Sequence, residues 1–470
     1  MSAPVIWIIL PAVAGISLYF LRRKFFTSTL VGAGLALLLA LLARFVPIGR
    51  KVDLGFTSFK LLDTLEVLGR RFTLAENDRF LLVLIYALAA FWFAAVYTAR
   101  AGRSTVPLGL LMVALLTAAL AVEPSLYAAL LVEMTALVCI PILIQPDMAS
   151  AAGQKLPLRG SLRFLIFQTM GMPLLLLTGW LLAGVETTPS AELALRAASL
   201  MGFGFALLLA IFPFHSWVLM LAEEAHPYTT AFVFVQFSWM VLLYGLHFLD
   251  RYPWLRGDEN VLFVLRLAGV MMVVVGGGSA WFEHHLGRMM GYAVMMETGY
   301  NLLAASIPNG LPLVFGLLLP RMLALGTWAL ALVVIQEAAQ SLDFKMVVGL
   351  GRKLPFATLA LILAQLSIAG VPLLAAFPLR LILLQHLSSA GGLTIWWVLA
   401  GSTGLLIAAA RTLTVLVSVS DSPKDVKTEN RPTLFLLGLA VAAIFVVGML
   451  PDRFLALMAQ GLQAFPDLIP

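Results

Sequence analysis

Three ionisable side chains inside apolar segments are the first candidates for chemistry in this sequence. Glu133 and Glu297 each lie near the middle of an apolar run, and His215 follows Pro213 within a third run. A carboxyl group removed from water can hold and release a proton near neutral pH, and a neutral imidazole can shuttle one. The pattern predicts proton transfer in a low-dielectric medium. The alternatives are a structural ion pair at Glu133 and, at His215, a histidine that caps freed backbone carbonyls.

Three arginines fall in further apolar runs: Arg321, Arg380 and Arg411. A charge at the centre of a bilayer costs about 2.5–3.5 kcal/mol on insertion scales, so such residues usually face protein or water. Arginine stays protonated and cannot itself relay a proton. We therefore expect Arg321 and Arg411 to act as partner cations of the glutamates. Arg380 either joins the ion-translocation site or extends its charged end to the membrane surface.

The composition indicates the medium in which these residues work. Of 470 residues, 61% are hydrophobic and 11% are charged, and the mean hydropathy is +0.99, so a water-exposed globular surface is excluded. The single cysteine, Cys139, excludes a disulfide framework, a cysteine-ligated iron–sulfur cluster and a thiol redox pair. The net charge of +6 comes from scattered basic residues, which does not favour nucleic acid as a partner.

Apolar runs bounded by charged residues, proline or glycine predict the elements that position these side chains. They indicate one all-α integral membrane domain of about fourteen transmembrane helices, in contact with the lipid bilayer. The expected helices span residues 4–21, 28–48, 79–99, 104–122, 125–145, 164–184, 196–221, 228–249, 260–282, 288–307, 311–335, 356–386, 392–417 and 433–450.

Basic residues in the loops predict the orientation. The loops after odd-numbered helices are far richer in lysine and arginine than the opposite short loops, which places them in the cytoplasm and both termini outside. We expect a multi-pass protein of the inner, cytoplasmic membrane of a prokaryote. The cytoplasmic loops carry Arg22, Arg23, Lys24, Arg100, Arg103, Lys155, Arg159, Arg163, Lys345, Arg352, Lys353, Lys424, Lys427 and Arg431.

Two predicted helices contain a break near mid-membrane. Helix 7 is interrupted at Pro213, and helix 12 at Gly370 and Pro372, because proline removes a backbone donor and clashes with the preceding turn. The breaks lie five helices apart, which predicts inverted five-helix repeats of helices 4–8 and 9–13. The alternative is that each proline only kinks its helix.

These elements divide the chain into four expected regions. Residues 1–103 hold helices 1–3 and a surface loop, 49–78, whose alternation at residues 52–56 predicts a small hairpin. Residues 104–249 and 260–417 form the two repeats, and residues 418–470 hold a cytoplasmic loop and the C-terminal helix.

Four local motifs, in this order and spacing, resemble a known family of membrane subunits. The family comprises the antiporter-like subunits of respiratory complex I, or NADH:quinone oxidoreductase, and the matching subunits of membrane-bound hydrogenases and multi-subunit Na⁺/H⁺ antiporters. The motifs cover roughly residues 125–380. They are Glu133-Met134-Thr135-Ala136-Leu137 with Ile140-Pro141; Phe212-Pro213-Phe214-His215-Ser216-Trp217 with Glu224-Ala225 and Pro227-Tyr228-Thr229-Thr230; Arg288-Met289-Met290-Gly291-Tyr292 with Gly299-Tyr300; and Gly349-Leu350-Gly351-Arg352-Lys353-Leu354-Pro355 with Ala369-Gly370-Val371-Pro372 and Phe377.

The resemblance implies a subunit that translocates protons or Na⁺ while partner subunits carry out quinone or hydrogenase chemistry. It implies no cofactor in this chain, no catalysis by the chain alone, and partners consisting of other membrane-arm subunits and a peripheral redox module. It also marks Glu133 as the glutamate that family members carry in helix 5, and it places Arg380 near the position of a family lysine.

The chain departs from the family at its central lysines. Leu208 stands at the helix 7 lysine position and Ala324 at that of helix 11, and no lysine occurs between Lys155 and Lys345. Either other groups conduct protons or the pathway is lost. The alternatives are therefore a non-conducting scaffold subunit, and a subunit of a cation/proton antiporter or of an inorganic-carbon uptake system.

Two remaining patterns favour structural roles. His284 and His285 are adjacent, next to Glu283, and no third ligand follows at a spacing typical of metal sites. We therefore expect no metal there. The run 276–278 is three glycines without a preceding strand or a phosphate-binding lysine, which predicts close helix packing.

Overall fold

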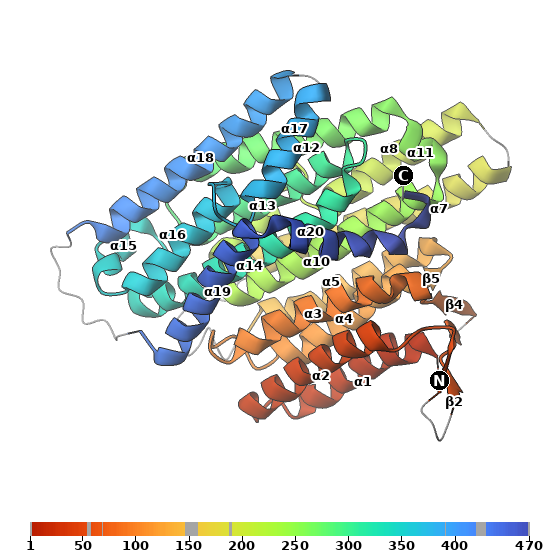
Figure 1. Cartoon of the computed structure of the whole chain (residues 1–470), viewed down its shortest axis with the longest axis horizontal. Coiled ribbons are helices and arrows are strands. Elements are labelled where there is room, and N and C mark those ends of the chain that lie inside the picture. The colour runs from red at the N-terminus through yellow and green to blue at the C-terminus, as the bar shows by residue number, and fades with distance from the viewer. Residues whose placement is uncertain are drawn as a thin grey trace.

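The computed structural model describes residues 2–53, 58–67, 69–145, 158–187, 190–390, 392–419 and 429–468. Lys155, Lys424 and Lys427, which support the orientation, lie outside these residues. The described part is almost entirely helical, and its long helices lie side by side in an elongated bundle (Figure 1). Its first half contains η1 (Val5–Ile9), α1 (Leu10–Phe20), α2 (Phe25–Phe45), η2 (Glu76–Asp78), α3 (Arg79–Val96), α4 (Thr105–Ala121), η3 (Ser125–Tyr127), α5 (Ala128–Leu143), α7 (Leu158–Thr187), α8 (Ala191–Leu208), α9 (Ser216–Glu224) and α10 (Pro227–Arg251).

The second half continues the bundle and ends in short helices. It contains α11 (Pro253–Gly257), α12 (Glu259–Phe282), α13 (Leu286–Ala305), α14 (Leu311–Ala339), α15 (Phe344–Val347), η4 (Leu350–Arg352), α16 (Pro355–Ala369), α17 (Phe377–Ala390), α18 (Gly392–Val417), α19 (Arg431–Met449), α20 (Pro451–Ala459), η5 (Gln460–Ala464) and η6 (Pro466–Leu468).

Apolar sequence and local capping explain why these segments are helical. In lipid a helix satisfies its backbone groups internally, so long apolar runs fold as helices. Side chains complete some of the N-termini: the Ser190 hydroxyl accepts from the Leu193 N–H at 3.2 Å, and the Asp258 carboxylate accepts from the Asn260 N–H at 2.8 Å. Proline occupies the first turn of α10 and α16, where its missing N–H costs nothing.

The membrane fold predicted from the sequence is confirmed, whereas the number of spans stays a prediction. In the described residues, nine helices are long and apolar enough to cross a membrane, or ten if the bent pair 344–352 and 355–369 forms one span. Two further apolar helices, Val5–Phe20 and Thr105–Ala121, are shorter. Each of the fourteen expected ranges contains helix, but the count of fourteen, the inverted repeats and the regional boundaries remain expectations.

Both expected interruptions are present as non-helical segments. Pro213 lies between the end of α8 and the start of α9. Gly370 and Pro372 lie between the end of α16 and the start of α17. Gly370 has a φ of +85°, a left-handed conformation that ends α16 and suits glycine.

Short strands lie at the end of the bundle that holds the N-terminus (Figure 1). In the expected hairpin, β1 (Lys51–Asp53) pairs antiparallel with β2 (Ser58–Lys60), and residues 54–57 lie outside the described part. A second sheet joins β3 (Thr64–Val67), β4 (Arg70–Thr73) and β5 (Val122–Glu123) in that order. This sheet was not predictable from the sequence, because the two residues of β5 follow an apolar helix directly.

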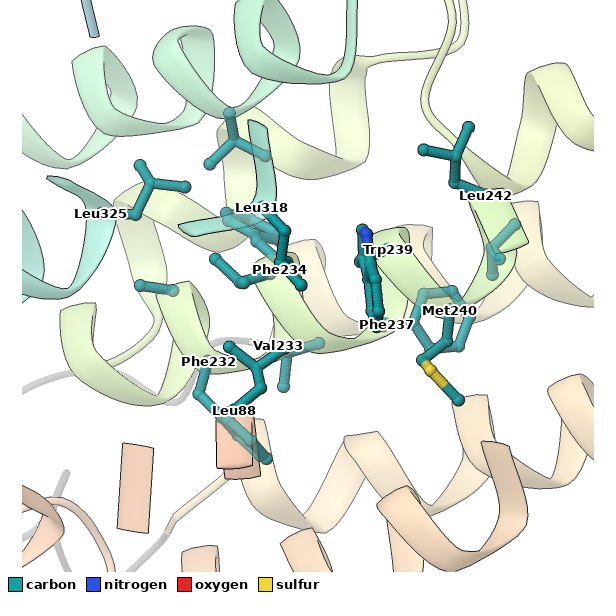
Figure 2. Close-up of a cluster of buried hydrophobic side chains, with 14 of the residues drawn as sticks. Leu88, Phe232, Val233, Phe234, Phe237, Trp239, Met240, Leu242, Leu318 and Leu325 are labelled. Atoms are coloured by element: carbon teal, nitrogen blue, oxygen red, sulfur yellow. The ribbon is translucent and has the colours of Figure 1, made fainter. Parts of the chain in front are cut away.

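The helices α10 and α14 form the centre of the bundle. Both are buried along most of their length, and the Trp239 and Phe315 rings meet edge to face at 6.3 Å. Figure 2 shows side chains of α10, including Phe234 and Trp239, near Leu318 of α14 on one side and Leu88 of α3 on the other. The side chains buried between these helices are mostly apolar, so the few polar groups among them are candidates for a functional role.

Glycines allow α12 to lie against two neighbours, α13 and α18. A Cβ atom on Gly277 would lie 1.8 Å from the Gly401 carbonyl oxygen of α18, and one on Gly276 would lie 2.8 Å from the Tyr292 carbonyl oxygen of α13. Gly278 has open space instead, with nothing within 4 Å. The expectation of close helix packing is therefore met at the first two glycines of the run.

We expect Gly277→Ala to lower the free energy of unfolding by about 1–3 kcal/mol, because α12 and α18 would be forced apart. Gly278→Ala is the matched control, and we expect it to be neutral or to stabilise the helix by up to about 1 kcal/mol. Thermal unfolding of the detergent-purified chain measures both effects. Equal midpoints for the two variants would contradict this packing.

Candidate charged site within the bundle

The centre of the candidate site is a buried ion pair between two helices. Glu297 lies on α13 and Arg380 lies in the first turn of α17, and their side chains form an ion pair through Oε1 and Nη2. Glu297 is 1% exposed and Arg380 is 3% exposed. Arg380 therefore does not extend to the membrane surface, which corrects one of the two sequence-based interpretations. Its guanidinium neutralises a carboxylate in the protein interior.

The break in the predicted helix 12 positions Arg380. A Cβ atom on Gly370 would lie 3.2 Å from Arg380 Cδ and 3.5 Å from its Nη1, so the glycine leaves room for the arginine. The guanidinium carbon lies 3.8 Å from the centroid of the Tyr300 ring, a cation–π contact. The Tyr300 hydroxyl in turn lies 2.6 Å from Ser402 Oγ on α18. These contacts fix the cation beside Glu297.

Arg321 adds a second buried positive charge. It lies on α14, is 1% exposed, and is close enough to Glu297 for an electrostatic interaction. Its Nη2 lies 3.4 Å from the Phe234 carbonyl oxygen and 3.4 Å from Thr298 Oγ1. With two arginines and one glutamate, the formal charge of the site is 2 − 1 = +1 when Glu297 is ionised.

Several polar atoms around this site have no hydrogen-bond partner among the described protein groups. Such buried groups cost roughly 1–3 kcal/mol each when they stay unpaired, and buried water commonly satisfies them. The site therefore carries more hydrogen-bonding capacity than its side chains use. The atoms are Glu297 Oε2, Arg380 Nε and Nη1, Arg321 Nε and Asn301 Oδ1; Gln365 Oε1 and both amide atoms of Gln236 are buried and unpaired elsewhere in the bundle.

Glu133 forms a separate polar site between α5 and α7. Its Oε1 accepts a hydrogen bond from the Thr169 hydroxyl at 2.6 Å, and its Oε2 has no partner among the described groups. The neighbouring Gln168 is 1% exposed, and its amide is also without a described partner. No arginine or lysine pairs with Glu133 in the described residues, so the alternative of a structural ion pair is not supported.

His215 and Arg411 lie apart from the central ion pair. The His215 ring stacks on Phe212 at 5.5 Å between centroids, and its Nδ1 has no hydrogen-bond partner among the described groups. Arg411 Nη2 lies 3.2 Å from His284 Nε2 near the end of α18. The expectation that Arg411 partners a glutamate is therefore wrong, and Arg380 takes that place beside Glu297.

A network of charged side chains surrounds the start of α13. Arg288 pairs with Glu283 at 3.0 Å and with Glu223 of α9 at 3.6 Å. Burial lowers the pKa of His285, and the carboxylates of Asp343, Glu223 and Glu283 partly oppose this shift. Its neutral Nδ1 accepts from the Arg288 N–H at 3.3 Å. Among the described residues, no group of three or more His, Cys, Asp or Glu side chains is placed to hold a metal ion.

Sequence reasoning missed several neutral groups of the central site. Asn301 follows Glu297 by four residues on α13, the spacing that places two side chains on one helix face, and could have been found in this way. Tyr300 and Ser402 gave no comparable signal, because their role depends on how α13 and α18 pack.

These features define a class of protein. A multi-pass helical membrane protein with interrupted helices and buried charges is built like an ion transporter. Residues 148–408 match the family described as NADH:quinone oxidoreductase/Mrp antiporter, TM. Because the match covers more than half of the sequence, the chain belongs to this family of antiporter-like membrane subunits.

Individual relatives share part of the sequence. The chain is 27% identical over 284 residues to NADH-quinone oxidoreductase subunit N of Rhodococcus opacus, covering 60% of this chain and 51% of the relative. It is 28% identical over 270 residues to subunit N 1 of Herpetosiphon aurantiacus, covering 54% of each chain. The chain thus spans about half the length of the curated relatives that it matches.

Solved structures share the whole fold at low sequence identity. A chain of the archaeal membrane-bound sulfane sulfur reductase is similar with a TM-score of 0.81 at 17% identity, over 99% of this chain and 97% of that one. A chain of the Mrp complex from a Dietzia species gives 0.80 at 18%, over 98% and 96%. One of respiratory complex I from Thermus thermophilus gives 0.70 at 19%, over 99% and 100%. These likenesses establish the fold alone.

We expect Arg380→Met to destabilise the chain by about 3–5 kcal/mol, because it leaves the Glu297 carboxylate buried beside one cation fewer. The double variant Glu297→Gln/Arg380→Met should recover a large part of this loss, since neither charge then remains unpaired. Thermal unfolding of the four proteins of this double-mutant cycle measures the coupling. Additive effects of the two substitutions would contradict the pairing.

Proposed function

We propose that this chain is a membrane-arm subunit of a redox-driven ion pump that translocates protons, or Na⁺, across the inner membrane of a prokaryote. Its family membership and the printed names of its relatives support this proposal. Electron carriers and quinone or hydrogenase chemistry would reside in a peripheral redox module, and further membrane-arm subunits would flank the chain. This chain would itself hold no cofactor.

The observation that carries the proposal is the buried Glu297–Arg380 pair with its unpaired polar neighbours. Stability alone does not require a buried ion pair, because replacing such a pair by apolar residues of similar volume commonly leaves a protein equally stable or more stable. Asn301, whose Oδ1 is unpaired, can hold water, and water beside a carboxyl group provides a route for protons.

Each charged residue would have its own role in this route. Glu297 binds and releases the proton. Arg380 and Arg321 stay charged and set the electrostatic field, because their guanidinium groups cannot relay protons. Protonation of Glu297 raises the formal charge of the site by one and weakens its attraction to Arg380, so proton transfer is linked to the position of α17. Glu133, with Thr169, would be a second proton-binding position between α5 and α7.

Two observations favour other functions and define what a test must exclude. Leu208 and Ala324 are apolar where the family resemblance places lysines, which favours a non-conducting scaffold. The fold shared with a chain of the Mrp complex favours a subunit of a cation/proton antiporter. A subunit of an inorganic-carbon uptake system belongs with this second alternative. In the scaffold, Glu297 and Arg380 would serve only stability.

We expect Glu297→Gln to reduce coupled proton pumping by about 100-fold or more while the complex remains assembled, because the amide cannot bind a proton. The complex is purified through this chain from native membranes, its subunits are identified by mass spectrometry, and pumping is measured in liposomes. Glu337→Gln is the matched control, because Glu337 belongs to an exposed ion pair with Arg100 at 3.1 Å.

Normal pumping by an assembled Glu297→Gln complex would contradict proton transfer through Glu297 and support the scaffold. Purification without any redox subunit would contradict the redox-driven pump and direct the assay to an antiporter.

A further inference from the structure

A basic surface lies where the loops after α1 and α3 meet at one end of the helices α1–α4. The first loop holds Arg22, Arg23 and Lys24, and the second holds Arg100 and Arg103. Arg22 Nη1 lies 3.4 Å from Ser104 Oγ, which places the two loops side by side. Figure 1 shows α1–α4 as neighbouring helices of the red-to-orange layer. We call these five residues the α1–α4 basic surface.

Most of the charge on this surface is not neutralised by the chain. Arg100 pairs with Glu337 at 3.1 Å, and Arg22 donates to the Tyr19 hydroxyl at 2.8 Å. Arg23, Lys24 and Arg103 are exposed and form no ion pair with any described residue. With five cations and one carboxylate, the surface has a formal charge of 5 − 1 = +4. It therefore attracts an anion with several negatively charged oxygens.

Aromatic side chains lie directly beside these cations. The Phe26 and Tyr97 rings meet edge to face at 5.2 Å, and the Phe25 and Tyr97 rings lie 5.5 Å apart. Phe26 is 59% exposed and Tyr97 is 49% exposed, so neither ring is covered by the packing of the bundle. Exposed rings at helix ends occupy the level of the lipid headgroups and upper acyl chains. We call Phe26 and Tyr97 the aromatic shelf.

We propose that the α1–α4 basic surface and the aromatic shelf together bind one anionic phospholipid. Its phosphate lies among Arg23, Lys24 and Arg103, and its acyl chain lies along Phe26 and Tyr97. Basic residues at the end of a helix group attract anionic headgroups, and the shelf adds an apolar contact that a free phosphate ion cannot use. Loop charge that only orients the chain would need no exposed rings beside it. This binding does not depend on ion translocation.

Native mass spectrometry of the full chain tests the proposal. The chain is purified in a mild detergent and titrated with phosphatidylglycerol or with phosphatidylcholine of the same acyl chains. We expect one phosphatidylglycerol to be retained preferentially, and Arg23→Gln/Lys24→Gln/Arg103→Gln to weaken this retention by about tenfold. Phe26→Ala should weaken it as well, without any change of charge. Glycerol phosphate, which has the headgroup but no chains, should not compete.

A matched control separates this site from general attraction. Arg159→Gln/Arg163→Gln/Lys345→Gln removes the same charge from the start of α7 and from α15, which are expected on the same membrane face, and we expect it to leave retention unchanged. Equal losses in the two triple variants would overturn the proposal, as would competition by glycerol phosphate. If the basic-surface variant keeps its lipid but loses a co-purifying subunit, the surface binds a protein partner and the proposal is wrong. Circular dichroism confirms that each variant is folded.

Discussion

A charge inside the bundle must be neutralised or hydrated, and in this chain that requirement centres on Glu297. The carboxylate is met by Arg380 from a helix that begins only after the break at Gly370, and this break gives the arginine room. Tyr300 holds the guanidinium from one side, and Ser402 holds the Tyr300 hydroxyl. The interrupted helix, the glycine and the packing of α13 against α18 thus all serve one ion pair. Arg321 adds a second buried positive charge close enough to Glu297 for an electrostatic interaction.

The two polar sites of the bundle differ in charge and therefore in what they can do. Glu133 has a hydroxyl partner and no cation among the described residues, whereas Glu297 has two arginines near it. A buried carboxyl group with no cation nearby bears the full desolvation cost when it ionises. A carboxylate beside arginines must be protonated against their electrostatic attraction. The family resemblance places lysines at Leu208 and Ala324, which are apolar, and near Arg380, which cannot give up a proton, so water and Glu297 must provide the mobile protons if the site conducts.

The sequence was most informative where one segment determines its own structure. Apolar runs predicted the helices, Pro213 and Gly370 marked the breaks, and the alternation in the loop 49–78 marked β1 and β2. Pairing across the fold was not predictable: Glu297 and Arg380 are 83 residues apart, and nothing local shows that the break turns Arg380 inward. Arg411 was assigned to a glutamate because it lies in an apolar run, yet its position near the end of α18 brings it to His284. The depth of a residue in the membrane, and the neighbour that its side of the helix faces, depend on how the helices pack. Composition does not encode this packing.

Proton transfer through Glu297 requires that its site hold water, and a high-resolution cryo-EM map of the chain within its native complex shows whether it does. We expect ordered water within hydrogen-bond distance of Glu297 Oε2 and Asn301 Oδ1, atoms that protein groups leave unpaired. A continuous file of such water would support proton transfer through the site. A dry site, in which these atoms pair with one another through changed side-chain conformations, would contradict the account and leave the ion pair as a structural element alone.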